Sequence, residues 1–242
     1  MLREIISESE WKDVREFLSP RIFSVVPLRK ATRQFRKISS NYFDRAACEH
    51  ALAHRQEWLD RKQLPVVLRS THTVPLGDGA LGGQRALEIY FHQLFYGHIA
   101  VLDMRYERFG GINGKVEWAP QPFYVEWDSE FQEAIQDMYL GFYCEDEDRY
   151  DRGLEGMGLM CAGDIFLEHF GGEEHEVSFK IHDFIETFRN TLHRCKKSKE
   201  KAHPNLIPLG IFIVTLYDQL EKLGGSYNPH KAFFEAVDVD EF

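Results

Sequence analysis

The sequence predicts a mainly α protein, a multi-helix bundle with a small antiparallel β-hairpin insert. Apolar residues recur at helical spacing along most of the chain, whereas strand-like segments gather at residues 98–127. Hydrophobic residues make up 43% of the 242 residues and charged residues 28%, which is enough apolar content for a packed core. We therefore expect a single helical domain over residues 1–242, with a basic segment at 20–38 and the insert at about 98–127.

Helix signals are clear in the first hundred residues. Ser7 and Glu10 have the spacing of a capping box, and Ser19-Pro20 ends the short helix that they open. The segments expected here are this helix to about Leu18, an irregular basic stretch at 20–38, helices at 39–62 and 81–96, and a short strand at Val66–Leu68.

The β-hairpin insert is predicted from an Asn-Gly pair between two strand-like segments. Asn113-Gly114 separates His98–Arg105 from Lys115–Trp118, and such a pair favours a tight hairpin turn. A third extended piece, Phe123–Trp127, follows two prolines. We expect a small antiparallel element on the surface of a helical body.

Helices are expected to fill the rest of the chain. Residues 204–223 are apolar almost all round through Tyr217, so this helix should lie at the centre of the bundle. The strongest apolar stripe consists of Val177, Ile181, Phe184, Ile185, Phe188, Leu192 and Cys195. Three other helices are expected to begin at the N-caps Asp128, Asp146 and Asn228, and a short helix is expected at 162–170. The acidic tail at 238–241 is expected to fray.

Charge is distributed unevenly along the chain. The formal net charge of −10 argues against bulk nucleic-acid binding, yet no acidic residue lies between Glu16 and Asp44. The cations expected to hold an anionic ligand are Arg29, Lys30, Arg33, Arg36 and Lys37. If the segment is helical, Arg29, Arg33 and Arg36 share one face. The alternative is a solvated loop that pairs with the protein's own carboxylates.

Aromatic residues are dense around the expected hairpin. Tyr106, Phe109, Trp118 and Trp127 are the residues expected to form an exposed surface for a protein partner. The alternative is a hairpin that packs its aromatic side chains onto the bundle.

Histidine and glutamate spacing offers a second kind of site. His50 and His54 are four residues apart beside Glu49, and Glu88 and His92 are also four apart. Two helices that each present carboxylate and imidazole groups can together supply the ligands of a metal site in a helix bundle. The alternative is that these histidines are hydrogen-bonded core residues, and the usual Glu-x-x-His spacing is absent.

The spacing of the cysteines and the absence of common catalytic motifs narrow the classes of function that the sequence allows. The four cysteines, Cys48, Cys144, Cys161 and Cys195, include no C-x-x-C pair, so we expect reduced, buried thiols. The charged N-terminus and the short apolar runs predict a cytoplasmic protein without a membrane span. A nucleophile elbow, a P-loop and a dinucleotide fingerprint are all missing.

Four segments follow one another in the C-terminal two-thirds: RALEIYFHQLFYG, GHIAVLDM, DMYLGFYCEDEDRYDRGLEGMGL and LYDQLEKLGGSYNPHKAF. Their order resembles the C-lobe of the UbiB/AarF atypical-kinase family. On this resemblance, Asp103 would occupy the position of the metal-binding aspartate. Met104 and Arg105 stand where the family has Phe-Gly, and no H-x-D-x-x-x-x-N loop precedes them. Because phosphoryl transfer needs metal and positioning groups together, the resemblance implies a non-catalytic, pseudokinase-like protein.

These observations favour a non-catalytic binding or adaptor protein that acts through the basic segment and the aromatic hairpin, with a protein or an anionic ligand as its partner. A helical-bundle metalloenzyme with Glu and His ligands and a degenerate kinase-like protein are the two alternatives. The sequence names no cofactor.

Overall fold

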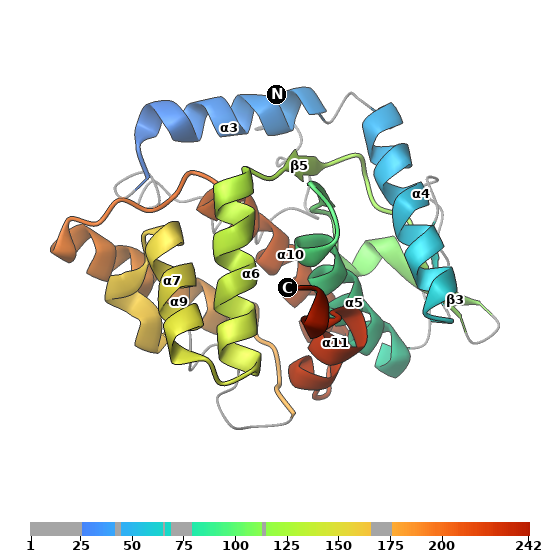
Figure 1. Cartoon of the computed structure of the whole chain (residues 1–242). Helices are drawn as coiled ribbons and strands as arrows, with labels where there is room; N and C mark the ends of the chain where they lie inside the picture. The colour runs from blue at the N-terminus through green and yellow to red at the C-terminus, as the bar shows by residue number, and fades with distance from the viewer. Residues whose placement is uncertain (1–25, 42–44, 65, 69–78, 113–114, 166–175) are drawn as a thin grey trace.

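The computed structural model describes residues 26–41, 45–64, 66–68, 79–112, 115–165 and 176–242, and it confirms a mainly α fold (Figure 1). The helix expected near residues 7–18 lies outside these ranges. The α-helices are α3 (Leu28–Asn41), α4 (Arg45–Arg61), α5 (Gly79–Phe95), α6 (Ser129–Tyr143), α7 (Glu147–Met157), α9 (Ile181–Ser198), α10 (Leu206–Leu223) and α11 (Pro229–Ala236). The 3-10 turns are η3 (Tyr106–Arg108), η4 (Met160–Ala162) and η5 (Val239–Glu241).

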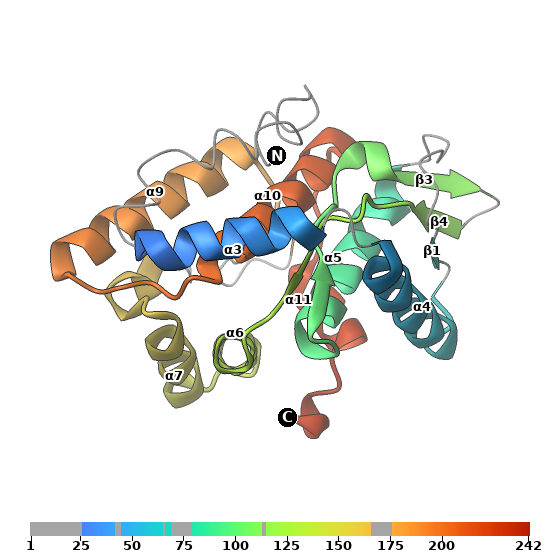
Figure 2. The same ribbon diagram turned by 90° about the horizontal axis from the view of Figure 1, so that it is seen from above.

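Helix α10 runs through the centre of the molecule, as its apolar composition predicts. Every residue from Leu206 to Leu220 is buried. Figure 2 shows α10 between the α9 side and the α5 side of the body, with α3 lying across it. None of the described helices is long and apolar enough to cross a membrane.

Helices α6 and α7 form a tightly packed pair. The side chain of Asp146 caps α7 by accepting a hydrogen bond from the Arg149 amide at 2.9 Å. Glycines allow the two backbones to approach each other. A Cβ at Gly153 would stand 2.4 Å from the Met138 amide nitrogen, and one at Gly141 would stand 2.2 Å from the Tyr150 nitrogen. Only residues without a side chain fit these positions.

Two small sheets occupy the region predicted as the β insert. The strands are β1 (Val66–Leu68), β2 (Ile99–Val101), β3 (Phe109–Ile112), β4 (Lys115–Trp118) and β5 (Tyr124–Glu126). Strands β3 and β4 form an antiparallel hairpin, but its first strand is Phe109–Ile112 and not the predicted His98–Arg105. The part of that predicted segment that forms β2 pairs antiparallel with β5 instead, because Gly110 and Gly111 take the extended conformation expected of the preceding residues. The predicted strand β1 adds to β4 in parallel. The Asn113-Gly114 pair itself lies outside the described residues.

Two further local expectations differ from the structure. Much of the stretch predicted to be irregular, residues 20–38, belongs to α3, which begins directly after Pro27. The helix contains neither glycine nor proline, and its arginines and lysines are good helix formers. The acidic tail does not fray as expected. Its residues form η5, and the ring of Phe242 lies 5.2 Å from that of Phe95.

Helix α3 lies across one face of the body beside β5 (Figures 1 and 2). Val26 and Ile38 are buried, and the Gln34 side chain hydrogen-bonds to Asn205 at the start of α10. Buried Ile38 and the hydrogen bond of Gln34 thus hold α3 against the body.

Candidate anion-binding surfaces

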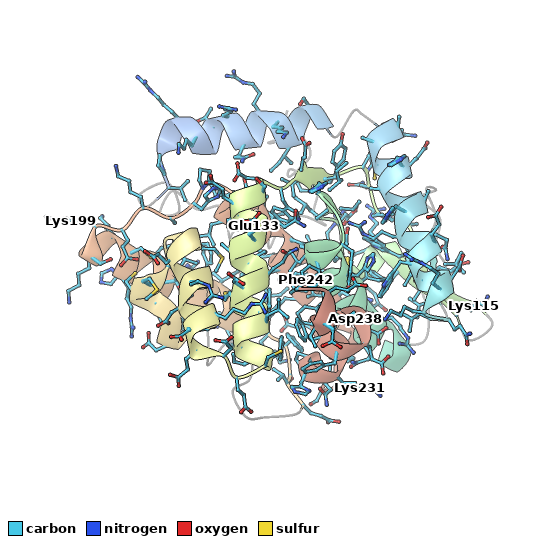
Figure 3. All side chains as sticks on the ribbon, in the orientation of Figure 1. Lys115, Glu133, Lys199, Lys231, Asp238 and Phe242 are labelled. Atoms are coloured by element: carbon cyan, nitrogen blue, oxygen red, sulfur yellow. The ribbon has the colours of Figure 1, made fainter. Side chains whose placement is uncertain are left out.

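The basic face of α3 consists of Arg29, Lys30, Arg33, Arg36 and Lys37. The five side chains are exposed, and α3 contains no acidic residue. Because this segment is helical, Arg29, Arg33 and Arg36 lie on one face of α3. Some of the long side chains of α3 extend away from the body (Figure 3). The structure thus presents the five predicted cations together on one exposed helix.

Only one of these cations forms an ion pair with a described residue. Lys37 Nζ lies 2.7 Å from Glu126 Oε2 on β5. The Lys37 hydrogen bond lowers the pKa of Glu126. No ion pair joins Arg29, Lys30, Arg33 or Arg36 to any carboxylate in the described ranges. Among the described residues, the alternative expectation that the basic segment pairs with the protein's own carboxylates is therefore met at Lys37 alone.

A groove of about 560 Å³ separates α3 from the body. Lys30, Arg33 and Lys37 line its α3 side, and Glu126 and Asp128 lie among the residues of the opposite side. His203 also lines the groove, with Nε2 lying 3.8 Å from Asp128 Oδ1. Burial lowers the pKa of His203, and the Asp128 carboxylate opposes that shift. The groove therefore has cations on one wall and carboxylates on the other.

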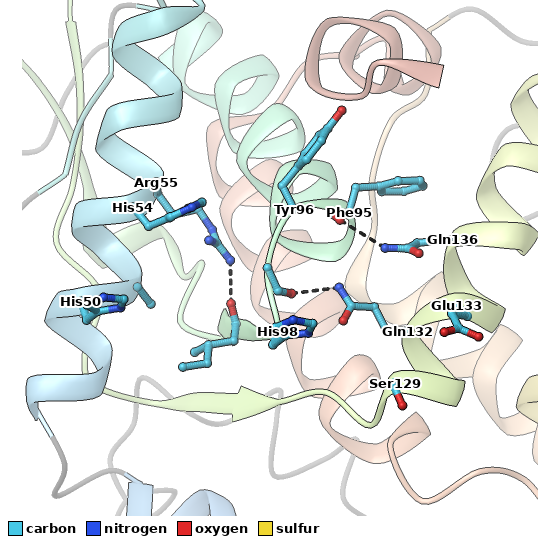
Figure 4. Close-up of a pocket in the computed structure, with 13 residues that line it drawn as sticks. His50, His54, Arg55, Phe95, Tyr96, His98, Ser129, Gln132, Glu133 and Gln136 are labelled. Atoms are coloured by element: carbon cyan, nitrogen blue, oxygen red, sulfur yellow. Dashed lines mark hydrogen bonds between the residues drawn. The ribbon is translucent and has the colours of Figure 1, made fainter. Parts of the chain in front are cut away.

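A second cavity, of about 520 Å³, lies between α4 and α6 (Figure 4). We call it the α4–α6 cleft. His50, His54 and Arg55 line it from α4, and Gly97 and His98 line it from the segment after α5. The residues contributed by α6 are Ser129, Gln132, Glu133 and Gln136. Ser129 lines both the cleft and the groove under α3, so the two cavities adjoin each other at the start of α6.

Arg55 is the unusual residue of this cleft, because it is a buried cation that forms no ion pair within the described part of the chain. Its side chain is buried, and Nη2 donates a hydrogen bond to the Ile99 carbonyl at 2.6 Å. Its Nε has no hydrogen-bond partner, and no ion pair joins Arg55 to any described residue. Burial lowers the pKa of the guanidinium to about 10, which still leaves it charged at neutral pH. A Cβ at Gly97 would stand 2.8 Å from Nη2, so the guanidinium needs glycine there.

The carbonyl groups at the end of α5 are satisfied from α6. Gln132 Nε2 donates to the Gly97 carbonyl at 2.9 Å, and Gln136 Nε2 donates to the Phe95 carbonyl at 3.2 Å. These contacts hold the amides of both glutamines against the backbone (Figure 4). Among the residues that line the cleft, Arg55 is therefore the one that carries a positive charge at neutral pH whatever the state of the histidines.

The five residues predicted as metal ligands do not come together. Glu49, His50 and His54 are exposed on α4, and the buried face of that helix carries other residues. Glu88 is buried, and both its oxygens accept hydrogen bonds from Arg85 at 2.6 Å. His92 is buried with its ring 3.8 Å from that of Trp58, and neither ring nitrogen has a partner. Within the described ranges, the ligand atoms that do converge belong to residues around η4 and the end of α9. Helix spacing could not show which face of each helix turns inward.

The predicted aromatic surface is not exposed. Phe109, Trp118 and Trp127 are buried in the core, and Tyr106 is half-buried. Trp118 Nε1 donates to the Asp103 carbonyl at 2.9 Å. These side chains are buried because two short sheets are not stable by themselves and their aromatic residues pack onto the helices.

Asp103, the residue singled out by the kinase-family resemblance, is fully buried in a polar network. Arg105 Nε donates to its Oδ1 at 2.7 Å, and the Gln121 amide donates to its Oδ2 at 2.9 Å. Arg108 Nε lies 3.3 Å from the same Oδ2. Both carboxylate oxygens are thus occupied by protein groups, and the side chain offers no exposed oxygen to a metal ion.

Sequence spacing also missed a pair of cysteines. Cys161 of η4 and Cys195 of α9 are 34 positions apart, but their sulfur atoms lie 3.2 Å from each other. Glu200 completes a group of three candidate ligands whose donor atoms lie within 4.8 Å of one another. No short cysteine motif marks this pair in the sequence, because the packing of α9 on η4 creates it.

No protein-family model matches the chain, and no curated protein matches it.

Proposed function

We propose that this protein is a binding protein that recognises an acidic segment of a partner protein through the basic face of α3. One observation carries the proposal: four exposed cations on one helix form no ion pair with the described residues, in a chain of net charge −10. Uncompensated like charges create a local positive potential that attracts carboxylates and speeds their encounter with the helix.

The groove under α3 supports a peptide rather than a polyanion as the ligand. Lys30 and Arg33 would pair with carboxylates of the ligand, and Asp128 on the opposite wall would accept hydrogen bonds from its amides or basic groups. A nucleic-acid backbone or an anionic membrane offers only negative charge to Glu126 and Asp128. We place this recognition in the cytoplasm, in line with the composition of the chain.

The test is a charge-reversal experiment with a matched control. One variant carries Arg29→Glu, Arg33→Glu and Arg36→Glu. The control carries Lys196→Glu, Lys197→Glu and Lys201→Glu, which are also exposed and change the net charge equally. The probe is a fluorescent peptide of alternating Glu and Gly, titrated by anisotropy at low and at physiological salt. We expect the α3 variant to lose about tenfold or more in affinity, and the control to lose little.

Two results would overturn the proposal. The first is an equal loss of affinity in both variants, which would show that binding depends on the net charge of the protein and not on the basic face of α3. The second is a clear preference for a single-stranded oligonucleotide or for anionic vesicles of matched charge over the peptide. Far-ultraviolet circular dichroism of each variant checks that the helices are intact.

A small anion in the α4–α6 cleft is a second candidate function, and Arg55 favours it. A buried guanidinium with an unused Nε can donate to a carboxylate or phosphate, and that pairing compensates for its burial. Isothermal titration with phosphate and with citrate tests this function. Arg55→Gln should abolish binding, whereas Arg61→Gln, on the exposed end of the same helix, should preserve it. Equal binding by wild type and Arg55→Gln would exclude the site.

A further inference from the structure

The sulfur atoms of Cys161 and Cys195 face each other across the contact between η4 and α9. Their 3.2 Å separation is closer than ordinary sulfur contact and about 1 Å longer than a covalent S–S bond of about 2.05 Å. Both cysteines are free thiols in this structure. A small movement of either side chain would therefore bring the two sulfurs to bonding distance.

The two thiols differ in accessibility. Cys161 is half-buried, whereas Cys195 is fully buried behind it. Burial raises the pKa of the Cys195 thiol well above its usual range, and its hydrogen bond with Cys161 acts in the same direction. A dissolved oxidant thus meets Cys161 first, and Cys195 is placed to react only with the sulfur beside it.

We propose that Cys161 and Cys195 form a reversible disulfide, in which Cys161 reacts first with a small disulfide oxidant such as oxidised glutathione and Cys195 then closes the bond. This modification is independent of the basic face of α3 and goes beyond the proposed binding function. In a reducing compartment, a pair of this kind cycles between two states rather than remaining oxidised.

The chemistry balances in two exchange steps. The Cys161 thiol gives up its proton, its sulfur attacks one sulfur of oxidised glutathione, and the glutathione S–S bond breaks. One glutathione leaves as thiolate and takes up a proton. The Cys195 thiol then loses its proton, its sulfur attacks the Cys161 sulfur, and the mixed S–S bond breaks as the second glutathione leaves and is protonated. Two protein thiols are oxidised and one glutathione disulfide is reduced to two thiols.

The experiment uses the full chain in a Cys144→Ser background, which removes an exposed cysteine. The reduced protein is incubated with oxidised glutathione, quenched with N-ethylmaleimide under denaturing conditions, and examined by intact mass and peptide mapping. We expect linked peptides that contain Cys161 and Cys195, no attached glutathione, and full reversal by dithiothreitol. The linked form should also melt at a higher temperature than the reduced form, because the bond restricts the unfolded chain.

Two further variants test whether Cys161 reacts with glutathione before Cys195 does, or whether the two thiols react equally. Adding Cys195→Ser should trap one glutathione on Cys161, because the second thiol is missing. Adding Cys161→Ser should leave Cys195 without glutathione, because it is buried. Equal glutathione attachment in both variants would contradict the order, and absence of the linked peptides in the Cys144→Ser background would sink the proposal.

The alternative to a disulfide is a metal ion bound by Cys161, Cys195 and Glu200. If the purified protein carries about one equivalent of zinc that Cys161→Ser removes, and if the zinc blocks disulfide formation, the residues are ligands of a metal site and the proposal is wrong.

Discussion

Arg105 and Asp103 form an ion pair inside the protein, only two residues apart in the chain. Arg105 Nε lies 2.7 Å from Asp103 Oδ1, and both side chains are almost completely buried. Arg105 Nη2 also donates to the Gln121 side chain at 3.2 Å, and Trp118 donates to the Asp103 carbonyl. The pair thus joins the segment after β2 to β4 and to the loop that precedes β5.

Removing the Asp103 carboxylate should be costly. Asp103→Asn would leave Arg105 and Arg108 buried near a neutral group, and breaking a buried pair in this way costs about 3–5 kcal/mol. Urea denaturation at pH 7 measures the loss of unfolding free energy. The matched control is Asp137→Asn, because the ion pairs of Asp137 with Arg149 and Arg152 are partly exposed. It should lose less than about 1 kcal/mol. Similar losses in both variants would refute this account of the Asp103 network.

Two glycines in helices should respond to alanine in opposite directions. Gly153→Ala places a Cβ against the α6 backbone and should destabilise the protein by about 1–3 kcal/mol or more. A Cβ at Gly82 of α5 would meet its nearest neighbour, Leu223 Cδ1, at 3.6 Å, which is ordinary contact. Gly82→Ala should therefore stabilise the protein by about 0.5–1 kcal/mol, because alanine favours helix. Thermal and urea unfolding measure both changes, and a stabilising Gly153→Ala would contradict the close packing of α6 and α7.

Acid should destabilise the protein partly through His92. Burial lowers the pKa of His92 from 6.5 to about 2, with a further contribution from the charge of Arg55. Below pH 6.5 the unfolded chain binds a proton that the folded protein rejects, so stability falls as the pH falls towards about 2. Between pH 7 and pH 5 this one residue should account for a loss of about 2 kcal/mol.

His92→Phe should remove that loss, since neither ring nitrogen has a hydrogen-bond partner. The measurement is urea denaturation from pH 5 to pH 8 for both proteins. The difference between them should be constant above about pH 7.5, which serves as the internal control. An unchanged difference down to pH 5 would show that His92 takes up a proton in the folded protein.

The Lys37–Glu126 pair links the stability of α3 to its proposed function. Both side chains are about half exposed, so Glu126→Gln should cost less than about 1 kcal/mol of stability. The same change frees Lys37 and removes a negative charge from the groove. Affinity for the acidic peptide should rise by up to about fivefold, and the gain should shrink with added salt. Glu130→Gln, an exposed carboxylate on α6, is the control for net charge. Weaker peptide binding by Glu126→Gln would place the ligand elsewhere.

Much of the fold could be predicted because local patterns determine it. The continuous apolar run of α10, the N-caps Asp146 and Asn228, and strand β4 all appear where the sequence indicates them. Each of these signals depends on neighbouring residues and on the period of the element. Residues 28–38 are the local exception, because a run of cations is as compatible with a solvated loop as with the exposed side of a helix.

The candidate sites could be predicted less well, and for one common reason. His50 and His92 share a helical spacing pattern with other residues, but His50 is exposed, whereas the buried ring of His92 lies 3.8 Å from that of Trp58. Only the rotation of each helix about its axis decides between these outcomes, and packing partners distant in sequence fix that rotation.

The sequence by itself determined the mainly α class, the central helix and the cations that α3 presents, because periodicity and charge are properties of contiguous segments. The tertiary structure alone decided that Phe109, Trp118 and Trp127 are buried, that Arg55 forms no ion pair with a described residue, and that the sulfur of Cys161 lies beside that of Cys195. These are relationships between residues tens of positions apart, and they arise only when helices pack against one another.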